Sequence, residues 1–77
     1  MTEILPRLHA LAVTRFGPGA AALGADDDLF QTLGVDSLAA LDLLTDLEGA
    51  FGVEIPDWEI QGVSTLRGLA DVLARRL

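Results

Sequence analysis

Leucine-rich segments at helical spacing are the feature that most constrains the fold of this chain. In three segments, apolar side chains recur every three or four residues, a spacing that places them on one face of an α-helix. The segments run from about residue 3–6 to Phe16, from Ser37 to Phe51, and from Leu66 to Leu77. Each such helix must bury its apolar face against another. We therefore predict an all-α fold, a small four-helix bundle of three main helices plus a short third helix.

The size of the chain and its lack of cysteine determine how such a bundle can be stabilised. The 77 residues include no cysteine and a single histidine, His9, so neither a disulfide nor a zinc site of thiolates or clustered histidines can form. A domain of this length is near the lower limit for folding on its own core. We predict one domain over residues 1–77, stabilised by packing, with no metal site.

The predicted connections follow from proline and glycine. Pro6 fits only the first turn of the first helix, where its missing N–H is not needed. Gly17 and Pro18 end that helix and begin a long loop, residues 17 to about 35, "GPGAAALGADDDLFQTLGV". The second half of this loop is apolar, so we expect it to pack on the bundle with a short helical turn.

The last third of the chain predicts two more helices. Pro56 disfavours the helical conformation at Ile55, so we predict that "GVEIPD" forms an extended link. The stretch "WEIQG" then suits the short third helix, and Ser64 or Thr65 caps the last one. Trp58 in the short helix has two interpretations: it packs half-buried over that helix, or it contacts cargo or a partner.

The helix predicted for residues 37–51 has apolar residues on two faces. At about 100° per residue, one face is centred on Leu47, and Leu38 projects about 180° away from it. Leu38 and Leu41 therefore lie on the exposed side, with Asp42, Thr45 and Glu48. Leu38 either folds back onto Phe30 or Val35, or anchors a partner. The predicted core residues of this helix are Ala40, Leu43, Leu44, Leu47, Ala50 and Phe51.

The dipeptide Asp36-Ser37 at the start of this helix also has two interpretations. Aspartate is a good N-cap, because its carboxylate accepts hydrogen bonds from the first free backbone N–H groups. The serine hydroxyl would sit at a helix N-terminus, which favours a phosphate. It is suited to carrying a phosphate ester but not to making one unaided, because His9, the one histidine, lies in another helix. No catalytic residue is predicted.

The charge distribution excludes one class of partner. Ten acidic residues and no basic residue lie between Phe16 and Leu66, and the formal net charge is −7. Nucleic-acid binding requires the opposite sign. The acidic segment is either a solvated surface or a docking surface for basic partners. No apolar run is long enough to cross a membrane, and no signal peptide is recognisable, so we predict a soluble cytoplasmic monomer.

The stretch "LGVDSLAALDLLTDLEGAFGVEIPD", residues 33 to 57, resembles the acyl and peptidyl carrier proteins. It has the L-G-x-D-S-L serine motif, a leucine-rich helix, and the F-G-V and E-I-P-D elements that follow. "VSTLRGLADVL" resembles the last helix of the family. The resemblance covers essentially the whole chain, and Met1 favours a discrete protein.

The resemblance implies a function for the serine. It implies that Ser37 Oγ is esterified by 4′-phosphopantetheine, which a phosphopantetheinyl transferase takes from coenzyme A with magnesium. The arm would hold acyl or aminoacyl groups as thioesters. The transferase and the loading, condensing and tailoring enzymes of a biosynthetic pathway would dock on the acidic helix face. The recognition residues implied by the resemblance are Asp36, Leu38, Asp42 and Glu48. The helical wheel adds Leu41 and Thr45 on the same face.

Two departures from the family pattern bear on the pathway. A familiar fatty-acid carrier has acids where this chain has Ala39 and Gly49, so its docking helix is more acidic. Peptidyl carriers have a glycine pair where this chain has Gly34-Val35. We expect a specialised pathway, polyketide or nonribosomal peptide synthesis, with fatty-acid synthesis as the alternative. A different class of protein, a helical interaction module without a prosthetic group, also fits the exposed leucines.

Overall fold

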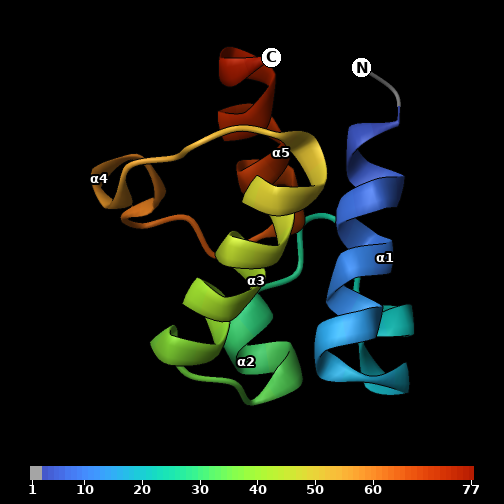
Figure 1. Cartoon of the computed structure of the whole chain (residues 1–77). Helices are drawn as coiled ribbons and strands as arrows, with labels where there is room; N and C mark the ends of the chain where they lie inside the picture. Colours follow the sequence, from blue (N-terminus) through green and yellow to red (C-terminus); the bar gives the residue numbers. More distant parts are fainter. Residues whose placement is uncertain (1–2) are drawn as a thin grey trace.

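Three long helices form the body of the molecule in the computed structural model, which describes residues 3–77 (Figure 1). α1 (Ile4–Phe16) runs antiparallel to α3 (Ser37–Phe51) and α5 (Leu66–Arg76) and packs against both. α2 (Leu29–Leu33) and α4 (Asp57–Ile60) are short, and the 3-10 helix η1 (Pro18–Ala22) follows α1. No strand occurs in residues 3–77. The predicted all-α bundle is confirmed, whereas the first two residues of the predicted domain lie outside the described part.

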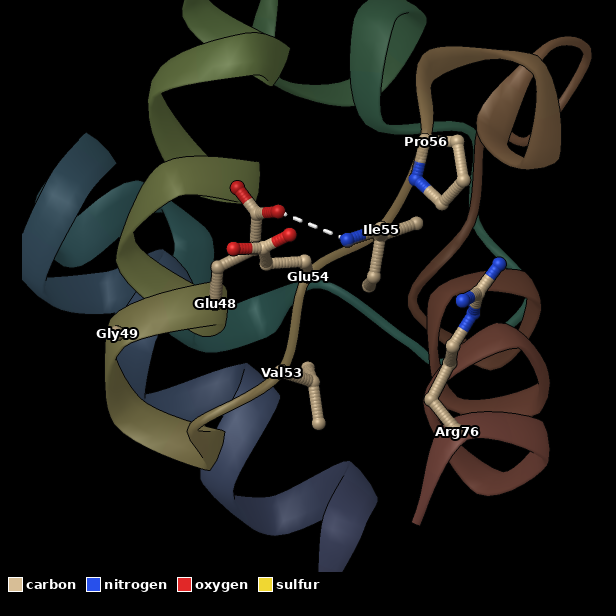
Figure 2. Close-up of a pocket in the computed structure, with 7 residues that line it drawn as sticks. All are labelled: Glu48, Gly49, Val53, Glu54, Ile55, Pro56 and Arg76. Carbon is tan, nitrogen blue, oxygen red and sulfur yellow. Dashed lines mark hydrogen bonds between the residues drawn. The ribbon is translucent and has the colours of Figure 1, made fainter.

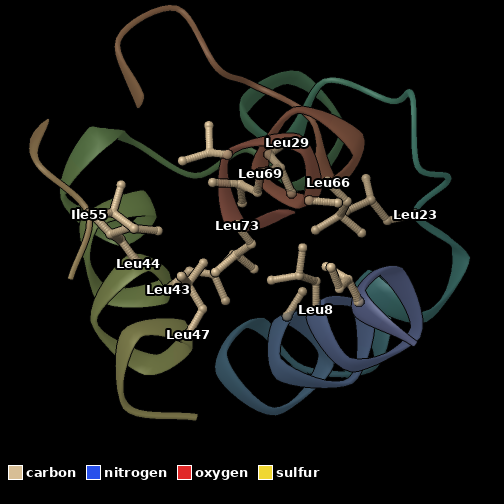
Figure 3. Packing of buried hydrophobic residues seen from close by; sticks show 14 of the residues in the cluster. Leu8, Leu23, Leu29, Leu43, Leu44, Leu47, Ile55, Leu66, Leu69 and Leu73 are labelled. Carbon is tan, nitrogen blue, oxygen red and sulfur yellow. The ribbon is translucent and has the colours of Figure 1, made fainter. Parts of the chain in front are cut away.

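The core lies where the three long helices converge (Figure 3). Leu8 of α1, Leu47 of α3 and Leu73 of α5 are each fully buried. Burying one leucine contributes about 1.5–3 kcal/mol, and no disulfide adds to this in a chain without cysteine. Packing of the predicted leucine faces therefore supplies the stability. The buried residues are Ile4, Leu8, Ala12, Ala20, Leu23, Leu29, Leu43, Leu44, Leu47, Ile55, Leu66, Leu69, Ala70, Val72 and Leu73.

The long connection between α1 and α3 is fixed to the start of α5. The Leu29 N–H donates to the Ser64 carbonyl at 2.7 Å, and the Arg67 N–H donates to the Ala25 carbonyl at 2.9 Å. The Arg67 side chain also pairs with Asp26, with 2.6 Å between Nε and Oδ1. The expected helical turn in the second half is α2. The helix η1 in the first half was not expected from the sequence.

Thr65, one of the two predicted caps, begins the last helix. Its Oγ1 accepts a hydrogen bond from the Gly68 N–H at 3.0 Å. Gly52, directly after α3, adopts the left-handed conformation (φ 69°, ψ 35°) that ends this helix. The bounds of α3 and the start of α5 therefore agree with the prediction.

Two residues predicted for the apolar stripes are exposed. Ala50 of α3 and Leu77, which follows α5, line an open hollow of about 220 Å³ beside the first turn of α1. Arg7 covers the ring of Phe51, with its guanidinium carbon 4.1 Å from the ring centroid. Its Nη2 donates to the Ala50 carbonyl at 3.1 Å.

In residues 3–77, no helix is long and apolar enough to cross a membrane.

Candidate functional site

The candidate site is the start of α3, where a glycine and an aspartate direct the chain into the helix. Gly34 ends α2 in the left-handed conformation (φ 67°, ψ 28°), which glycine adopts without a steric penalty. Asp36 is extended, and its Oδ1 accepts a hydrogen bond from the Ala39 N–H at 3.0 Å. The predicted N-cap is therefore confirmed. This geometry makes Ser37 the first residue of α3.

Ser37 is exposed and lies on the rim of an open groove of about 450 Å³. α3 forms one side of the groove through Ser37, Ala40 and Leu41. The other side comes from α4 and the segment before α5, and Phe30 of α2 also lines the groove. The hydroxyl thus combines solvent access, a helix N-terminus that favours phosphate, and a groove beside it. These features fit a phosphate ester on Ser37 that carries an extended group.

No histidine is placed to activate this serine. His9 lies on α1, and its Nε2 donates to the carbonyl of Ala20 in η1 at 2.8 Å. That bond uses the imidazole to fix η1 against α1. A nucleophilic serine needs an adjacent base. The imidazole of His9 is therefore not beside Ser37.

The exposed face of α3 agrees with the helical-wheel prediction. Leu38 is 70% exposed and Leu41 is 41% exposed, so Leu38 does not fold back onto Phe30 or Val35. Asp42 and Thr45 are also exposed. The Thr45 hydroxyl donates to the Leu41 carbonyl of its own helix at 3.1 Å, which leaves its oxygen able to accept. Two apolar side chains and one carboxylate therefore face solvent within two helical turns.

The acidic residues of α3 differ in what they already contact. Asp46 accepts two hydrogen bonds from Arg15 of α1, each at 2.8 Å. These bonds, together with the charge of Arg15, hold the pKa of the Asp46 carboxyl below its usual range. The pKa of Arg15 is raised by Asp46 and, to a smaller extent, by Asp42. Asp46 is thus paired within the fold, whereas the carboxylate of Asp42 has no hydrogen-bond or ion-pair partner in residues 3–77.

Glu48 is a half-buried residue that holds the link after α3 (Figure 2). Its Oε2 accepts a hydrogen bond from the Ile55 N–H at 2.8 Å. The two residues border a hollow of about 650 Å³ between the link and Arg76 of α5. This hollow is larger than the groove at Ser37 but has no contact with the serine. The helical wheel predicts Glu48 on the exposed side of α3, but the residue is half-buried because its carboxylate bonds to the link.

The short helix α4 contributes Trp58, which is 67% exposed. The interpretation that Trp58 packs half-buried over its own helix is therefore wrong. Instead, α4 is attached through its neighbours: Glu59 pairs with Arg76 of α5, and Ile60 packs against the core. With Ile60 turned inward, Trp58 projects into solvent. The other interpretation of Trp58, a contact to cargo or partner, stays open.

Sequence reasoning did not find the second wall of the groove. Asp57, Ile60 and residues 61–64 come together with Ser37 only in the folded chain. The motif around Ser37 carries no signal for them, because they lie 20 or more residues away in the sequence.

Comparisons with known proteins agree with this geometry. Residues 7–73 match the family model described as "Phosphopantetheine attachment site". Acyl carrier protein 2 of Pseudomonas aeruginosa is 34% identical over 73 residues, which cover 95% of this chain and 92% of that protein. The acyl carrier protein of Rubrobacter xylanophilus is 32% identical over 69 residues, covering 90% and 85%. That of Chloroherpeton thalassium is 26% identical over 74 residues, covering 96% and 92%.

Proposed function

Because this chain belongs to the acyl carrier proteins, which carry covalently attached 4′-phosphopantetheine, we propose that Ser37 is the attachment residue. Proteins of this family are carriers and not enzymes, and they interact with a phosphopantetheinyl transferase and with biosynthetic enzymes. The observation that carries the assignment is the exposed Ser37 hydroxyl at the N-terminus of α3, beside an open groove. The 4′-phosphopantetheine group supplies a thiol, which the chain lacks, and this thiol holds the cargo as a thioester.

Ser37 takes part in modification as the acceptor. The transferase moves the phosphopantetheinyl group from coenzyme A to Ser37 Oγ, which loses its proton as the new phosphate ester forms and adenosine 3′,5′-bisphosphate leaves. Asp36 holds the first turn of α3 through the Ala39 N–H, so the serine is presented in one position. The helix N-terminus stabilises the negative charge of the ester.

We propose that partner enzymes dock on the start of α3. Leu38 and Leu41 supply the apolar anchor, Asp42 supplies a negative charge, and Thr45 offers a hydrogen-bond acceptor. Asp36 lies at the edge of this docking face, next to the modified serine. Apolar anchors bordered by charges give both affinity and orientation in protein interfaces. Glu48 lies on the same helix, but its carboxylate already accepts a hydrogen bond from the Ile55 N–H.

The pathway is proposed from the charge of α3. Asp46 is paired with Arg15, and Ala39 and Gly49 stand where a fatty-acid carrier has acids. This sparse set of free charges favours partners other than those of a standard fatty-acid synthase. We therefore propose that the protein carries acyl or aminoacyl intermediates in polyketide or nonribosomal peptide synthesis, as a cytoplasmic monomer of one domain over residues 1–77.

Fatty-acid synthesis remains the second candidate function. The relatives above are named acyl carrier proteins, and that name favours acyl over aminoacyl cargo. The two candidates differ in which loading enzyme accepts the modified protein. Malonyl transfer by a fatty-acid malonyltransferase supports fatty-acid synthesis, whereas aminoacylation by an adenylating enzyme supports the nonribosomal pathway.

Intact-mass measurement tests the attachment site. Incubation with coenzyme A, magnesium and a broad-specificity transferase should add one phosphopantetheine to the wild type and none to Ser37→Ala. An equal gain in Ser37→Ala would refute the assignment. A helical interaction module without a prosthetic group would show no gain in either protein, and partner binding would survive the substitution.

A further inference from the structure

Glu48 and Asp42 lie on the same helix but differ in what their carboxylates contact. Asp42 is exposed, and its carboxylate has no hydrogen-bond or ion-pair partner within residues 3–77. Glu48 is half-buried, and Oε2 is already hydrogen-bonded to the Ile55 N–H at 2.8 Å. A partner cation that drew this carboxylate outward would compete with the bond to Ile55. We propose that Asp42 carries the docking charge of α3, whereas Glu48 is a positioning residue for the α3–α4 link.

Glu48 holds the link through its backbone as well as its side chain. Its carbonyl accepts hydrogen bonds from the N–H groups of Gly52 at 2.9 Å and Val53 at 3.2 Å. With the bond from Oε2 to Ile55, one residue satisfies three of the N–H groups that follow α3. Ile55 as a whole residue is only 5% exposed, so its backbone N–H has little access to water. Figure 2 shows the carboxylate of Glu48 directed at the link from the end of α3.

The position of the link determines the position of α4. Pro56 directly follows Ile55, and α4 begins at Asp57. At its other end, α4 is held by the ion pair between Glu59 and Arg76. The Glu48 contact therefore fixes the entry to α4, and the ion pair fixes its last turn to α5.

Because Asp57 and Ile60 line the groove beside Ser37, this chain of contacts reaches the site. Glu48 does not line that groove and acts on it only through Ile55 and α4. The groove and Ser37 belong to the proposed function, so the inference about the site rests on that proposal. The inference about the link rests only on the hydrogen bond.

Two substitutions of Glu48 separate positioning from docking. Glu48→Gln removes the charge but keeps a side-chain oxygen that can accept from Ile55, whereas Glu48→Ala removes both. Asp42→Asn is the matched control on the same helix. The readouts are hydrogen exchange of the Ile55 amide by NMR and kcat and KM for modification by a broad-specificity transferase with coenzyme A.

We expect Glu48→Ala to lower the exchange protection of the Ile55 amide about tenfold and to slow modification. Glu48→Gln should keep both the exchange protection of the Ile55 amide and the modification rate close to those of the wild type. Asp42→Asn should leave Ile55 protected and raise KM about two- to fivefold, with a weaker dependence of KM on salt. An unchanged Ile55 amide in Glu48→Ala would refute the positioning role. So would a Glu48→Gln protein with Ile55 protected but KM raised as in Asp42→Asn.

If Glu48→Ala does not fold, the salt dependence of KM in Glu48→Gln decides the matter. A dependence equal to that of the wild type supports positioning, and a weaker one refutes it. Failure of the proposed function would appear separately, as a wild type that gains no phosphopantetheine. The Ile55 exchange experiment would still test the hydrogen bond in that case.

Discussion

Arg15 of α1 and Asp46 of α3 form an ion pair of two hydrogen bonds, Nε to Oδ2 and Nη2 to Oδ1, each 2.8 Å long. The two residues are 31 positions apart, so the contact joins two long helices of the bundle. It lies on the partly exposed surface, where single ion pairs contribute little to stability. The pair also leaves fewer unpaired acidic side chains on α3.

The Arg15–Asp46 pair predicts how stability depends on pH. The pKa of Asp46 is lowered in the fold, chiefly by the hydrogen bonds from Arg15, and the pKa of Asp26 is lowered in the same way by Arg67. A carboxyl with a depressed pKa adds stability above its unfolded pKa of about 3.9, and this is lost as pH falls through the folded pKa. We expect the free energy of unfolding to decrease below about pH 4.

Urea unfolding between pH 3 and pH 7 measures this dependence. Asp46→Asn should show a smaller loss of stability at low pH than the wild type. Asp42→Asn is the control, because Asp42 has no such pair. If the free energy of unfolding of Asp46→Asn depends on pH as it does in the wild type, the ion pair does not contribute to the pH dependence.

Replacing Leu47 or Leu38 by alanine should affect different properties, because one side chain is buried and the other is exposed. Leu47 is fully buried, so Leu47→Ala should cost about 2–5 kcal/mol of unfolding free energy. Leu38 is 70% exposed, so Leu38→Ala should change stability by less than about 0.5 kcal/mol while slowing modification of Ser37. Thermal unfolding and transferase assays on both variants measure the two effects. An unfolded Leu38→Ala protein would place Leu38 in the core.

Asp36 has a capping role that can be separated from recognition. Asp36→Ala should cost about 1 kcal/mol, because the Ala39 N–H loses its acceptor. Asp36→Asn keeps a capping oxygen and removes the charge. If its stability is preserved and modification by the transferase slows, the charge of Asp36 contributes to recognition. Equal modification rates in Asp36→Asn and the wild type would restrict Asp36 to capping.

Trp58 provides an intrinsic probe of α4, because the chain has one tryptophan and no tyrosine. With 67% of Trp58 exposed, we expect the long-wavelength emission of a solvated indole and efficient quenching by acrylamide. Trp58→Phe should change the free energy of unfolding by less than about 0.5 kcal/mol. Blue-shifted, protected emission would instead indicate that Trp58 packs on the bundle.

The local sequence predicted those features that depend on neighbouring residues. The bounds of α3, its N-cap at Asp36 and the exposure of Leu38 follow from helical periodicity and capping chemistry. The helix η1 was missed because "PGAAA" has no apolar periodicity, and it is stabilised by the contact between His9 and Ala20 on another element. The exposure of Trp58 was uncertain for a similar reason, since burial of a residue in a four-residue helix depends on how that helix is attached.

The sequence by itself determined an all-helical carrier with a serine at the start of its acidic helix, because period, capping and motif are local properties of the chain. Only the tertiary structure decided which acids remain free and what forms the groove beside Ser37. Arg15 pairs with Asp46, Glu48 contacts Ile55, and Asp57 and Ile60 come next to Ser37. These contacts depend on the relative placement of helices, which core packing sets and no single segment encodes.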